Sequence, residues 1–529
     1  MEGMNHRPPW DHSMLTHILR LALVPSLCLL WAWPVDAQTT GASQGNAGVS
    51  GQSADDAAEL ARGWELYSRQ CAACHGADGR GAGPASDGLL PVPRDLGAGL
   101  FRIVSGLGGV PSEQDLLTVL RRGMPGSVMP AFDHLPDDDL SALVAVVRQI
   151  RVGAETDRLV AQTGLDRQLA RWRAEAALSP GPSPTLGERP EPSAGQAAMG
   201  QLLFEEGCAH CHGSDGCGAG LDLRDVRGDP GPARDLTRGL FKGGVEPEQI
   251  ARRIVLGLPG SAMPAFRYTE TELWALVQFV RSLIEPAADE NVRLVRRSVP
   301  AEKLRSTLDD VLAWDTAPTT WVALAPLVWR GDRPEGVSVA AFHDGRRLAL
   351  RVTWSDRTRD DSPGADDGLA LQLAPSADPP FLGMGSIDEP VLLASWRASW
   401  QRALPGAWVS RPVTAPGLPD RGGPSGQRSD GSAAPSAPTG EWPSRPLRGT
   451  GPGWRHPEPG LPSSLRALGS YGSDEWVVTM VWEPLDDAGL SLLASEAPLS
   501  IAFAVWDGAA GDRGGAKSIS NWQELWLQR

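Results

Sequence analysis

Two short stretches of the chain concentrate residue types that bind metals or cofactors. They read CAACHGADGRGAG, residues 71–83, and CAHCHGSDGCGAG, residues 208–220. Aligned position by position, they share two cysteines and one histidine, whereas His210 and Cys217 of the second stretch have no counterpart in the first. The shared residues are Cys71, Cys74 and His75 in the first copy and Cys208, Cys211 and His212 in the second. A repeated C-x-x-C-H pattern therefore defines the common site.

Cysteine and histidine at this spacing can serve a zinc ion, a redox dithiol or a covalently attached haem. A structural zinc site needs four protein ligands, and each copy offers three. In C-x-x-C-H, two thiols can add to the vinyl groups of one haem while the adjacent imidazole binds its iron. The repetition favours this third chemistry, so we expect two covalent haem c groups. They are attached through Cys71 and Cys74 and through Cys208 and Cys211, with His75 and His212 as iron ligands.

A second repeated motif lies downstream of each C-x-x-C-H. RRGMPGSVMPAF, residues 121–132, aligns with VLGLPGSAMPAF, residues 255–266, so Met129 corresponds to Met263, whereas Met124 faces a leucine. The paired methionines follow the first cysteine of their copy by 58 and 55 residues, which suits a small helical fold around one haem. We expect them to be the second iron ligands. His/Met ligation favours a raised potential and electron transfer over oxygen chemistry.

The residues around these motifs predict helices. Residues 54–70 place apolar side chains at helical spacing directly before the first haem motif, and residues 200–207 do the same before the second. After the Met loops, LSALVAVVRQI follows three aspartates, which suit a helix N-terminus, and LWALVQFVRSLI follows a capping box that begins at Thr269. Both segments resemble class I cytochrome c domains. The resemblance implies two all-α domains, over residues 54–152 and 196–286.

The start of the chain predicts export. A basic start precedes the apolar run LALVPSLCLLWAWPV, and VDA at residues 35–37 is a small-residue cleavage pattern. We expect residues 1–37 to be a cleaved signal peptide, residues 38–53 a flexible N-terminus, and the mature chain to be periplasmic. No other apolar stretch approaches the roughly 18 residues of a membrane span, so no transmembrane span is expected in the mature chain. The net charge of −15 argues against a nucleic-acid partner.

Composition divides the rest of the chain. Residues 153–195 combine a polar helical pattern with a Pro-rich stretch and predict a linker, and residues 287–310 predict another. In residues 311–529, segments such as EWVVTMVWEPL and LSIAFAVWDG alternate apolar and polar residues, which predicts an all-β, antiparallel sandwich. HDG at residues 343–345 is a hairpin signal. Residues 404–464 are dense in Pro, Gly and Ser and predict an insert in this domain.

Four motifs of the last domain occur in the order found in the haem b domain of ethylbenzene dehydrogenase gamma subunits. They are WDTAPTTWVALAP, PFLGMGSIDEPVLLASWRASW, GSDEWVVTMVWEPL and AFAVWDGAAGDRGGAKSISNW. The domain thus resembles this family, whose relatives occur in dimethyl sulfide dehydrogenase, selenate reductase and chlorate reductase. The resemblance implies one non-covalent haem b, held by Met384 and Lys517. The fusion to two cytochrome units and the long insert depart from the simplest members of the family and leave the partner enzyme open.

A lysine can bind iron only as the neutral amine, so Lys517 must lose its proton in a desolvated site. The glycine-rich approach to Lys517 allows the backbone to close on a flat cofactor. The other candidate residues have simpler expectations. Met480 is expected in the core, His343 in a turn, His456 in solvent and His134 in local packing or at the surface, and Cys217 has no partner left in the mature protein.

These expectations combine into a periplasmic electron-transfer subunit with two haem c groups and one haem b. By resemblance, its partners are a molybdenum-containing catalytic subunit of the dimethyl sulfoxide reductase family, an iron–sulfur subunit, and a soluble or membrane-bound redox carrier. The chain has no molybdenum or iron–sulfur motif of its own, so it is not expected to be catalytic by itself.

Two alternatives stay open. The first is a dihaem cytochrome c enzyme, of the peroxidase or thiosulfate-oxidising type, with a C-terminal β-sandwich binding module. Such chemistry needs an open iron position, whereas both copies supply a methionine. The second alternative makes the last domain a haem-free sandwich of the carbohydrate-binding kind.

Overall fold

The computed structural model describes most of the chain from residue 49 onward. The described residues are 49–98, 100–218, 220–285, 294–304, 314–315, 317–330, 333–374, 379, 391–403, 447–449, 458–459, 463–484 and 491–529. From Ala54 onward they belong to one compact unit. The predicted signal peptide, most of the predicted insert, Met384 and His456 lie outside the described residues. Among the described helices, none combines the length and the hydropathy of a membrane span.

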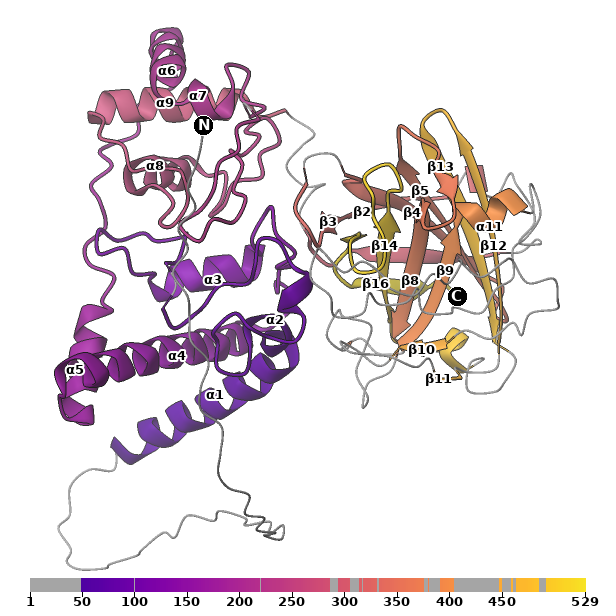
Figure 1. Cartoon of the computed structure of the whole chain (residues 1–529), viewed down its shortest axis with the longest axis horizontal. Helices are drawn as coiled ribbons and strands as arrows, with labels where there is room; N and C mark the ends of the chain where they lie inside the picture. Colours follow the sequence, from indigo (N-terminus) through magenta and orange to yellow (C-terminus); the bar gives the residue numbers. More distant parts are fainter. Residues whose placement is uncertain are drawn as a thin grey trace, which may run out of the picture. The chain divides into compact units, whose positions relative to one another are not determined.

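The first cytochrome segment is helical, as predicted, and is drawn in indigo to purple in Figure 1. Its helices are α1 (Val49–Gln70), α2 (Ala72–His75), the 3-10 helix η1 (Ser86–Gly88), α3 (Glu113–Arg122), α4 (Asp137–Thr163) and α5 (Arg167–Ala177). A capping box between Ser112 and Asp115 starts α3. Helix α4 continues through the domain boundary expected at residue 152 and ends where Gly164 adopts a left-handed conformation. The polar helical pattern after residue 153 is therefore divided between the end of α4 and α5.

The second cytochrome segment repeats the main helices of the first. They are α6 (Ala194–Gly207), α7 (Ala209–His212), α8 (Pro247–Leu256) and α9 (Glu270–Ser282). The capping box predicted at Thr269 is confirmed, because its hydroxyl accepts a hydrogen bond from the amide of Glu272 and the Glu272 carboxylate accepts one from Thr269. Helices α6 and α9 pack against each other around the buried Phe204 and Leu276.

The opening and closing helices of each segment approach closely at a glycine. A Cβ on Gly63 in α1 would overlap the backbone oxygen of Ala142 in α4, and a Cβ on Gly200 in α6 would overlap that of Ala275 in α9. Each glycine lies eight residues before the first cysteine of its motif. The same backbone approach therefore fixes the helix that leads into each C-x-x-C-H turn.

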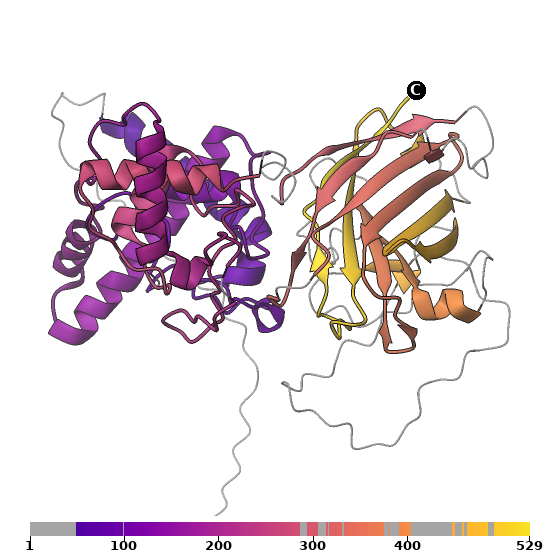
Figure 2. The same cartoon turned by 90° about the horizontal axis from the view of Figure 1, so that it is seen from above.

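The C-terminal region is mostly β, drawn from pink through orange to yellow in Figures 1 and 2. Its strands are β1 (Ser298–Lys303), β2 (Thr320–Ala323), β3 (Ala325–Pro326), β4 (Gly336–His343), β5 (Leu348–Ser355), β6 (Asp361–Ser362), β7 (Ala365–Asp366), β8 (Gly368–Ala374), β9 (Val391–Arg397), β10 (Leu447–Gly449), β11 (Glu458–Pro459), β12 (Ser463–Gly472), β13 (Glu475–Pro484), β14 (Leu499–Trp506), β15 (Ser518–Ile519) and β16 (Gln523–Leu527). One short helix, α11 (Ala398–Ala403), follows β9. Fourteen of the described strands form one sheet, whose main path is β11-β10-β9-β8-β14-β16-β1-β4-β5-β13-β12.

Most neighbours in this sheet are antiparallel, but β1 is parallel to both β4 and β16. Within residues 311–529, the segment predicted as an antiparallel sandwich, the described strand pairs are all antiparallel, and the two parallel pairs both involve β1. This strand falls inside residues 287–310, the segment predicted as a linker. Its sequence, SVPAEK, is short and gives little alternation, although Val299 and Ala301 are fully buried in the sheet. Its pairing depends on strands that are distant in the chain, which no local pattern reveals.

The sheet curves around a core rich in tryptophan (Figure 2). Strands β9 and β13 lie far apart in the sheet order, yet the ring centres of Trp396 and Trp476 are 4.9 Å apart. Met480 is buried in the same core, as predicted. The hairpin predicted at residues 343–345 joins β4 to β5. His343 is the last residue of β4 and is buried, with Nε2 lying 2.5 Å from the carbonyl oxygen of Gln528.

Candidate haem sites

Each C-x-x-C-H motif forms a short helical turn at the end of an entering helix. In the first copy, the amide of Cys71 donates to the carbonyl of Tyr67 over 2.9 Å, and the amide of His75 donates to that of Cys71 over 2.9 Å. In the second copy, the amide of His212 donates to the carbonyl of Cys208 over 3.0 Å. One turn of backbone hydrogen bonds therefore sets the spacing of both thiols and the imidazole in each copy.

Both motif histidines are held by a backbone carbonyl. Nδ1 of His75 lies 2.9 Å from the carbonyl oxygen of Arg94, and Nδ1 of His212 lies 2.9 Å from that of Arg234. A carbonyl oxygen can only accept, so Nδ1 carries the hydrogen and Nε2 keeps its lone pair for a metal. Burial lowers the pKa of both imidazoles, which favours this neutral form. Such support behind a histidine is typical of metal ligands.

The two Met loops have the same hydrogen-bond pattern. In the first, Ser127 Oγ donates to the carbonyl of Met124 over 2.8 Å and accepts from the amide of Met129 over 3.3 Å, while the amide of Met124 donates to the carbonyl of Met129 over 3.1 Å. In the second, Ser261 Oγ accepts from the amide of Met263 over 3.2 Å, and the other two bonds are repeated. A serine two residues before the methionine therefore braces both loops in the same way.

One connected cavity of about 1090 Å³ receives residues from both motifs and both Met loops. The predicted ligands and attachment residues on its wall are Cys71, Cys74, His75 and Met129 of the first copy and Cys208, Cys211, His212 and Met263 of the second. Leu120, Phe132 and Ile254 are among the apolar side chains of the wall. Burial raises the pKa of the Cys71 thiol to about 12 and that of Cys208 to about 11, as expected of thiols in an apolar setting. The surroundings fit an apolar macrocycle at each copy.

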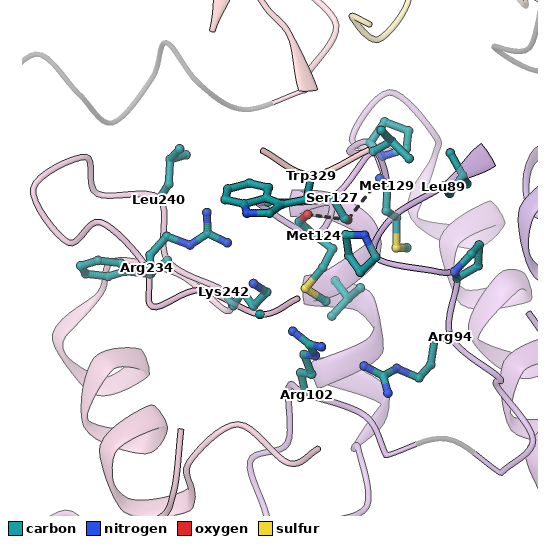
Figure 3. A pocket seen from close by; sticks show the side chains of 18 of the residues that line it. Leu89, Arg94, Arg102, Met124, Ser127, Met129, Arg234, Leu240, Lys242 and Trp329 are labelled. Carbon is teal, nitrogen blue, oxygen red and sulfur yellow. Dashed lines mark hydrogen bonds between the residues drawn. The ribbon is translucent and has the colours of Figure 1, made fainter. Parts of the chain in front are cut away.

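The cavity also carries several cations, which Figure 3 shows beside Met124, Met129 and Trp329. Burial and the repulsion of neighbouring cations lower the pKa of Arg94 and of Arg234 to about 10, and they lower the pKa of Lys242 well below its usual value. Arg102 forms an ion pair of 2.9 Å with the buried Asp225. Carboxylates entering the cavity would relieve this repulsion. Haem carries two propionate carboxylates, so the charge of the wall also fits the group.

Sequence reasoning missed these cations. Arg94 and Arg234 each open an R-D-L tripeptide at an equivalent place after the histidine of their copy. That repeat is the one signal that could have identified them. The role of this repeat can be recognised only from the fold. There, the carbonyl of each arginine lies beside a motif histidine, and the arginine side chain reaches the cavity.

Lys517 lies in the loop between β14 and β15 and also faces the cavity. Its Nζ lies 5.0 Å from the centre of the Trp506 ring. Burial, together with the charge of Arg397, lowers the pKa of Lys517 to about 8. The wall around it includes Leu371, Gln372, Leu393, Phe503, Trp506 and Trp522. A half-buried amine beside flat aromatic walls fits one axial ligand of a haem, while Met384, predicted as the other, lies outside the described residues.

The segment that carries Lys517 contacts the first Met loop through Asn521. This buried side chain donates from Nδ2 to the carbonyl oxygens of Ala131, over 3.3 Å, and of Leu294, over 3.2 Å. Ala131 comes two residues after Met129, and its own amide donates to the carbonyl of Leu294 over 3.1 Å. A short hydrogen-bonded path therefore joins the Lys517 segment to the first methionine loop.

A second path joins the first cytochrome segment to Lys517 through the backbone. The amide of Leu90 donates to the carbonyl of Leu327 over 2.8 Å, and the amide of Trp329 donates to the carbonyl of Leu90 over 2.8 Å. The amide of Leu327 donates in turn to the carbonyl of Lys517 over 2.9 Å. Backbone hydrogen bonds thus link Leu90 of the helical region to Leu327 and, through Leu327, to Lys517 in the β region.

Comparison with known families identifies the two helical segments. The family described as cytochrome C oxidase, cbb3-type, subunit III matches residues 58–146, and the family described as cytochrome c matches residues 197–283. Each match contains the C-x-x-C-H and the paired methionine of its copy. The chain contains two cytochrome c domains.

Similarity to individual proteins covers parts of the chain. The cytochrome subunit of fructose dehydrogenase from Gluconobacter japonicus is 26% identical, over 38% of this chain and 44% of that protein. The chain therefore spans less than half the length of this curated relative. Among solved structures, the Kuenenia stuttgartiensis reducing HAO-like protein complex is similar at 28% identity and a TM-score of 0.36, covering 42% of this chain and 96% of that chain. A family 9 carbohydrate-binding module from Caldicellulosiruptor kristjanssonii, in complex with glucose, is similar at 8% identity and a TM-score of 0.23, covering 44% and 97%.

The remaining histidines and the extra cysteine have separate surroundings. His134 lies on the cavity wall beside Phe132, with ring centres 6.3 Å apart. His343 is a buried strand residue rather than a turn residue. Cys217 is exposed. Cys217 also lines the cavity, so His134 and Cys217 lie near the haem motifs, whereas His343 is not among the described residues that line it.

Proposed function

We propose that this chain is a periplasmic electron-transfer subunit that holds two haem c groups and one haem b. The haem c groups are attached through Cys71 and Cys74 and through Cys208 and Cys211, with axial ligands His75 and Met129 in the first site and His212 and Met263 in the second. The haem b is held by Lys517 and Met384. When bound, each haem supplies a reversible one-electron couple at its iron.

The equivalence of the two cytochrome sites carries the proposal. In each copy a carbonyl fixes the histidine tautomer and a serine braces the methionine loop, and both sets of residues face one apolar cavity. These residues orient two ligands toward each site and exclude water from it. A protein ligand on both faces leaves no position for a substrate, which favours electron transfer over a dihaem peroxidase.

The place of the chain in a larger enzyme rests on two similarities. The relative from Gluconobacter japonicus is named as the cytochrome subunit of a dehydrogenase, which supports a separate catalytic partner. The motifs shared with ethylbenzene dehydrogenase gamma subunits support a molybdenum-containing catalytic subunit of the dimethyl sulfoxide reductase family with an iron–sulfur subunit. In the proposal, the haem b region meets these subunits, and the cytochrome domains pass electrons between them and a redox carrier.

A haem inventory of the full-length chain, matured with haem c, tests the proposal. We expect three haems per chain, of which acid acetone releases one and leaves two attached. All three should be low-spin in the resting spectrum, and the chain should not turn over hydrogen peroxide. A high-spin haem or peroxide turnover would contradict the electron-transfer assignment, whereas release of no haem would contradict the haem b assignment alone.

The partner is tested separately by purifying the tagged chain from its native source under mild conditions. We expect co-purifying subunits that contain molybdenum and iron–sulfur clusters by metal analysis. A co-purifying dehydrogenase without molybdenum would overturn the molybdenum partner and leave the electron-transfer role standing.

A further inference from the structure

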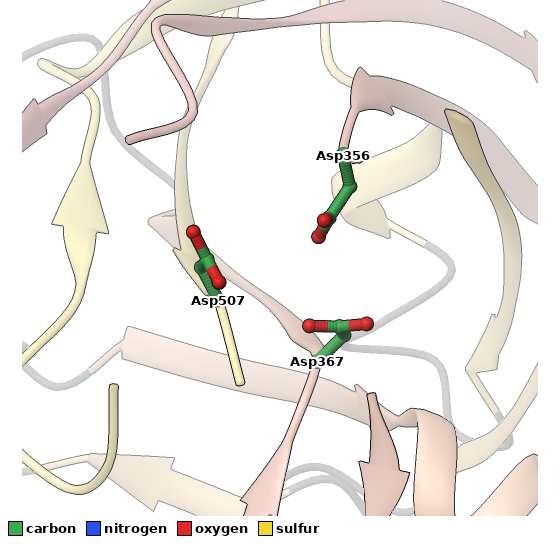
Figure 4. A group of neighbouring side chains, drawn as sticks. All are labelled: Asp356, Asp367 and Asp507. Atoms are coloured by element: carbon green, nitrogen blue, oxygen red, sulfur yellow. The ribbon is translucent and has the colours of Figure 1, made fainter. Parts of the chain in front are cut away.

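Three aspartates from distant parts of the β region converge at one end of the sheet. Asp356 directly follows β5, Asp367 directly precedes β8, and Asp507 directly follows β14. One carboxylate oxygen from each lies within 4.8 Å of the other two. Figure 4 shows the three carboxylates turned toward a common point.

The surrounding groups hold these carboxylates in place without neutralising them. Asp367 is fully buried and accepts hydrogen bonds from the amides of Gly508 and Asp360 and from the indole of Trp476, over 2.7 to 2.9 Å. Asp356 is 8% exposed. Its Oδ1 accepts from the amide of Thr358 over 3.0 Å.

The other carboxylate oxygen of Asp356 lacks a hydrogen-bond donor in the part of the chain that the structure describes. Oδ2 is buried and has no hydrogen-bond partner among the described residues. A buried carboxylate oxygen without a donor costs free energy, so a native structure that keeps one calls for an explanation, such as an ion that supplies the missing contact. In Figure 4 the Asp356 carboxylate points into the space between Asp367 and Asp507, where that ion would lie.

Neighbouring cations do not supply the compensation either. In the described part of the chain, no basic side chain lies within the 4.0 Å of an ion pair from Asp356 or Asp367. Arg330 lies 3.8 Å from Asp507 but makes closer contacts, of 2.7 Å, to Asp512. The described basic side chains therefore leave the cluster short of positive charge.

We propose that Asp356, Asp367 and Asp507 bind one divalent calcium ion. The donors are carboxylate oxygens without nitrogen or sulfur, which favours calcium or magnesium over zinc, copper or iron. Oxygens that bind calcium at about 2.3–2.6 Å lie no more than about 5 Å apart, which matches the cluster. Donors from three separate strand ends form an irregular set, and calcium tolerates irregular geometry better than magnesium does.

Such an ion would tie together three strands that are distant in the chain. Asp507 adjoins Trp506, whose ring contacts Lys517, and β8 and β14 also form part of the cavity wall around Lys517. Bound calcium would therefore brace the frame of the Lys517 cavity. The inference does not depend on the proposed function, because it concerns the β region whether or not that region holds haem.

Metal binding to the full-length chain tests the proposal directly. The chain is stripped with a chelator and dialysed, then titrated with calcium chloride by calorimetry, and bound calcium is counted after gel filtration. We expect one calcium ion per chain and a melting temperature that rises with calcium. Terbium replaces calcium in such sites, and we expect its emission to be sensitised by Trp476, whose indole donates to Asp367.

Substitutions test whether the calcium ion binds at the three aspartates. Asp356→Asn should weaken calcium binding by at least about tenfold, because it removes one of three charged donors. The matched control is Asp361→Asn, since Asp361 lies in the same region but pairs with Arg402 at 3.2 Å instead of joining the cluster. Equal calcium binding by Asp356→Asn and the unsubstituted chain would overturn the proposal. So would a stripped wild-type chain that binds no calcium at millimolar concentration or binds magnesium more tightly, and this measurement decides the matter even if Asp356→Asn fails to fold.

Discussion

Substitution of Lys517 gives the sharpest test of the haem b site. Its amine can bind iron only after losing a proton, so protons compete with haem for Lys517. The structure encloses the side chain beside Trp506 and lowers its pKa from 10.5 to about 8, chiefly by burial. The burial that makes this lysine costly to charge is thus the property that makes it available as a ligand.

The size of the effect follows from the pKa. At pH 7, a lysine with the ordinary pKa of 10.5 would need about 5 kcal/mol to give up its proton, at about 1.4 kcal/mol per pKa unit. With a pKa of about 8, Lys517 needs about 1.4 kcal/mol. Haem b affinity should therefore be independent of pH well above pH 8. It should fall about tenfold for each pH unit below that value, because the protonated amine cannot bind.

Haem titration of the full-length chain, followed by absorbance between pH 6 and 9.5, measures this dependence. Lys517→Met should bind the third haem without the pH dependence, because a thioether does not titrate in this range. Lys517→Ala should leave that haem with a spectrum of lost amine ligation, while the two haem c spectra stay as they were. The reasoning is refuted if the wild-type affinity is flat from pH 6 to 9.5, or if Lys517→Ala keeps the third spectrum unchanged.

Five further substitutions test the cytochrome domains and the contact of the first one with the β region. Met129→Ala and Met263→Ala should each retain both covalent haems. Each should remove the sulfur-to-iron absorption of one site, about half of the total, and lower the reduction potential of that haem. A variant that keeps the full absorption would exclude its methionine as a ligand. Asn521→Ala removes two hydrogen bonds to carbonyl oxygens, so we expect the free energy of unfolding to fall by about 1–3 kcal/mol. We also expect a shifted reduction potential for the haem c of the Met129 site. Equal shifts in both haem c potentials would count against a contact confined to the Met129 loop. Gly63→Ala and Gly200→Ala each place a Cβ on a facing backbone oxygen and should cost about 1–3 kcal/mol by thermal unfolding, with no loss speaking against the close helix approach.

The sequence gives a residue-by-residue prediction of the cytochrome sites because their chemistry demands fixed spacing. Two thiols and an imidazole must meet one macrocycle, so Cys71, Cys74 and His75 can be identified without a fold, and duplication then selects Met129 over Met124. The structure places these residues on one cavity wall. The arginines that hold the histidines escape notice, because a backbone carbonyl can come from any residue type and its role depends on where the loop passes.

The β region is less predictable for a physical reason. Its strands pair across long stretches of chain, and pairing rather than local pattern decides their direction, as β1 shows by lying parallel to β4 and β16. A desolvated Lys517 is expected only from the resemblance to a haem b domain, because the glycine-rich loop before it permits such a site without specifying it. The cluster of Asp356, Asp367 and Asp507 is likewise absent from any local motif, since its members come together only when three strand ends meet.

The two cytochrome domains are alike as sites but differ in how they meet the β region. The first is joined through a buried contact from Asn521 to Ala131 and through a backbone hydrogen bond from Leu90 to Leu327, and Leu327 continues to Lys517. The second is joined through an ion pair between Arg238 and Glu335, whose side chains are both about one-third exposed. A partly exposed ion pair is weak and is screened by salt, whereas hydrogen bonds between uncharged groups are not screened in this way. If haem b is held at Lys517, the position of the first cytochrome site relative to that haem is therefore fixed more firmly than the position of the second site.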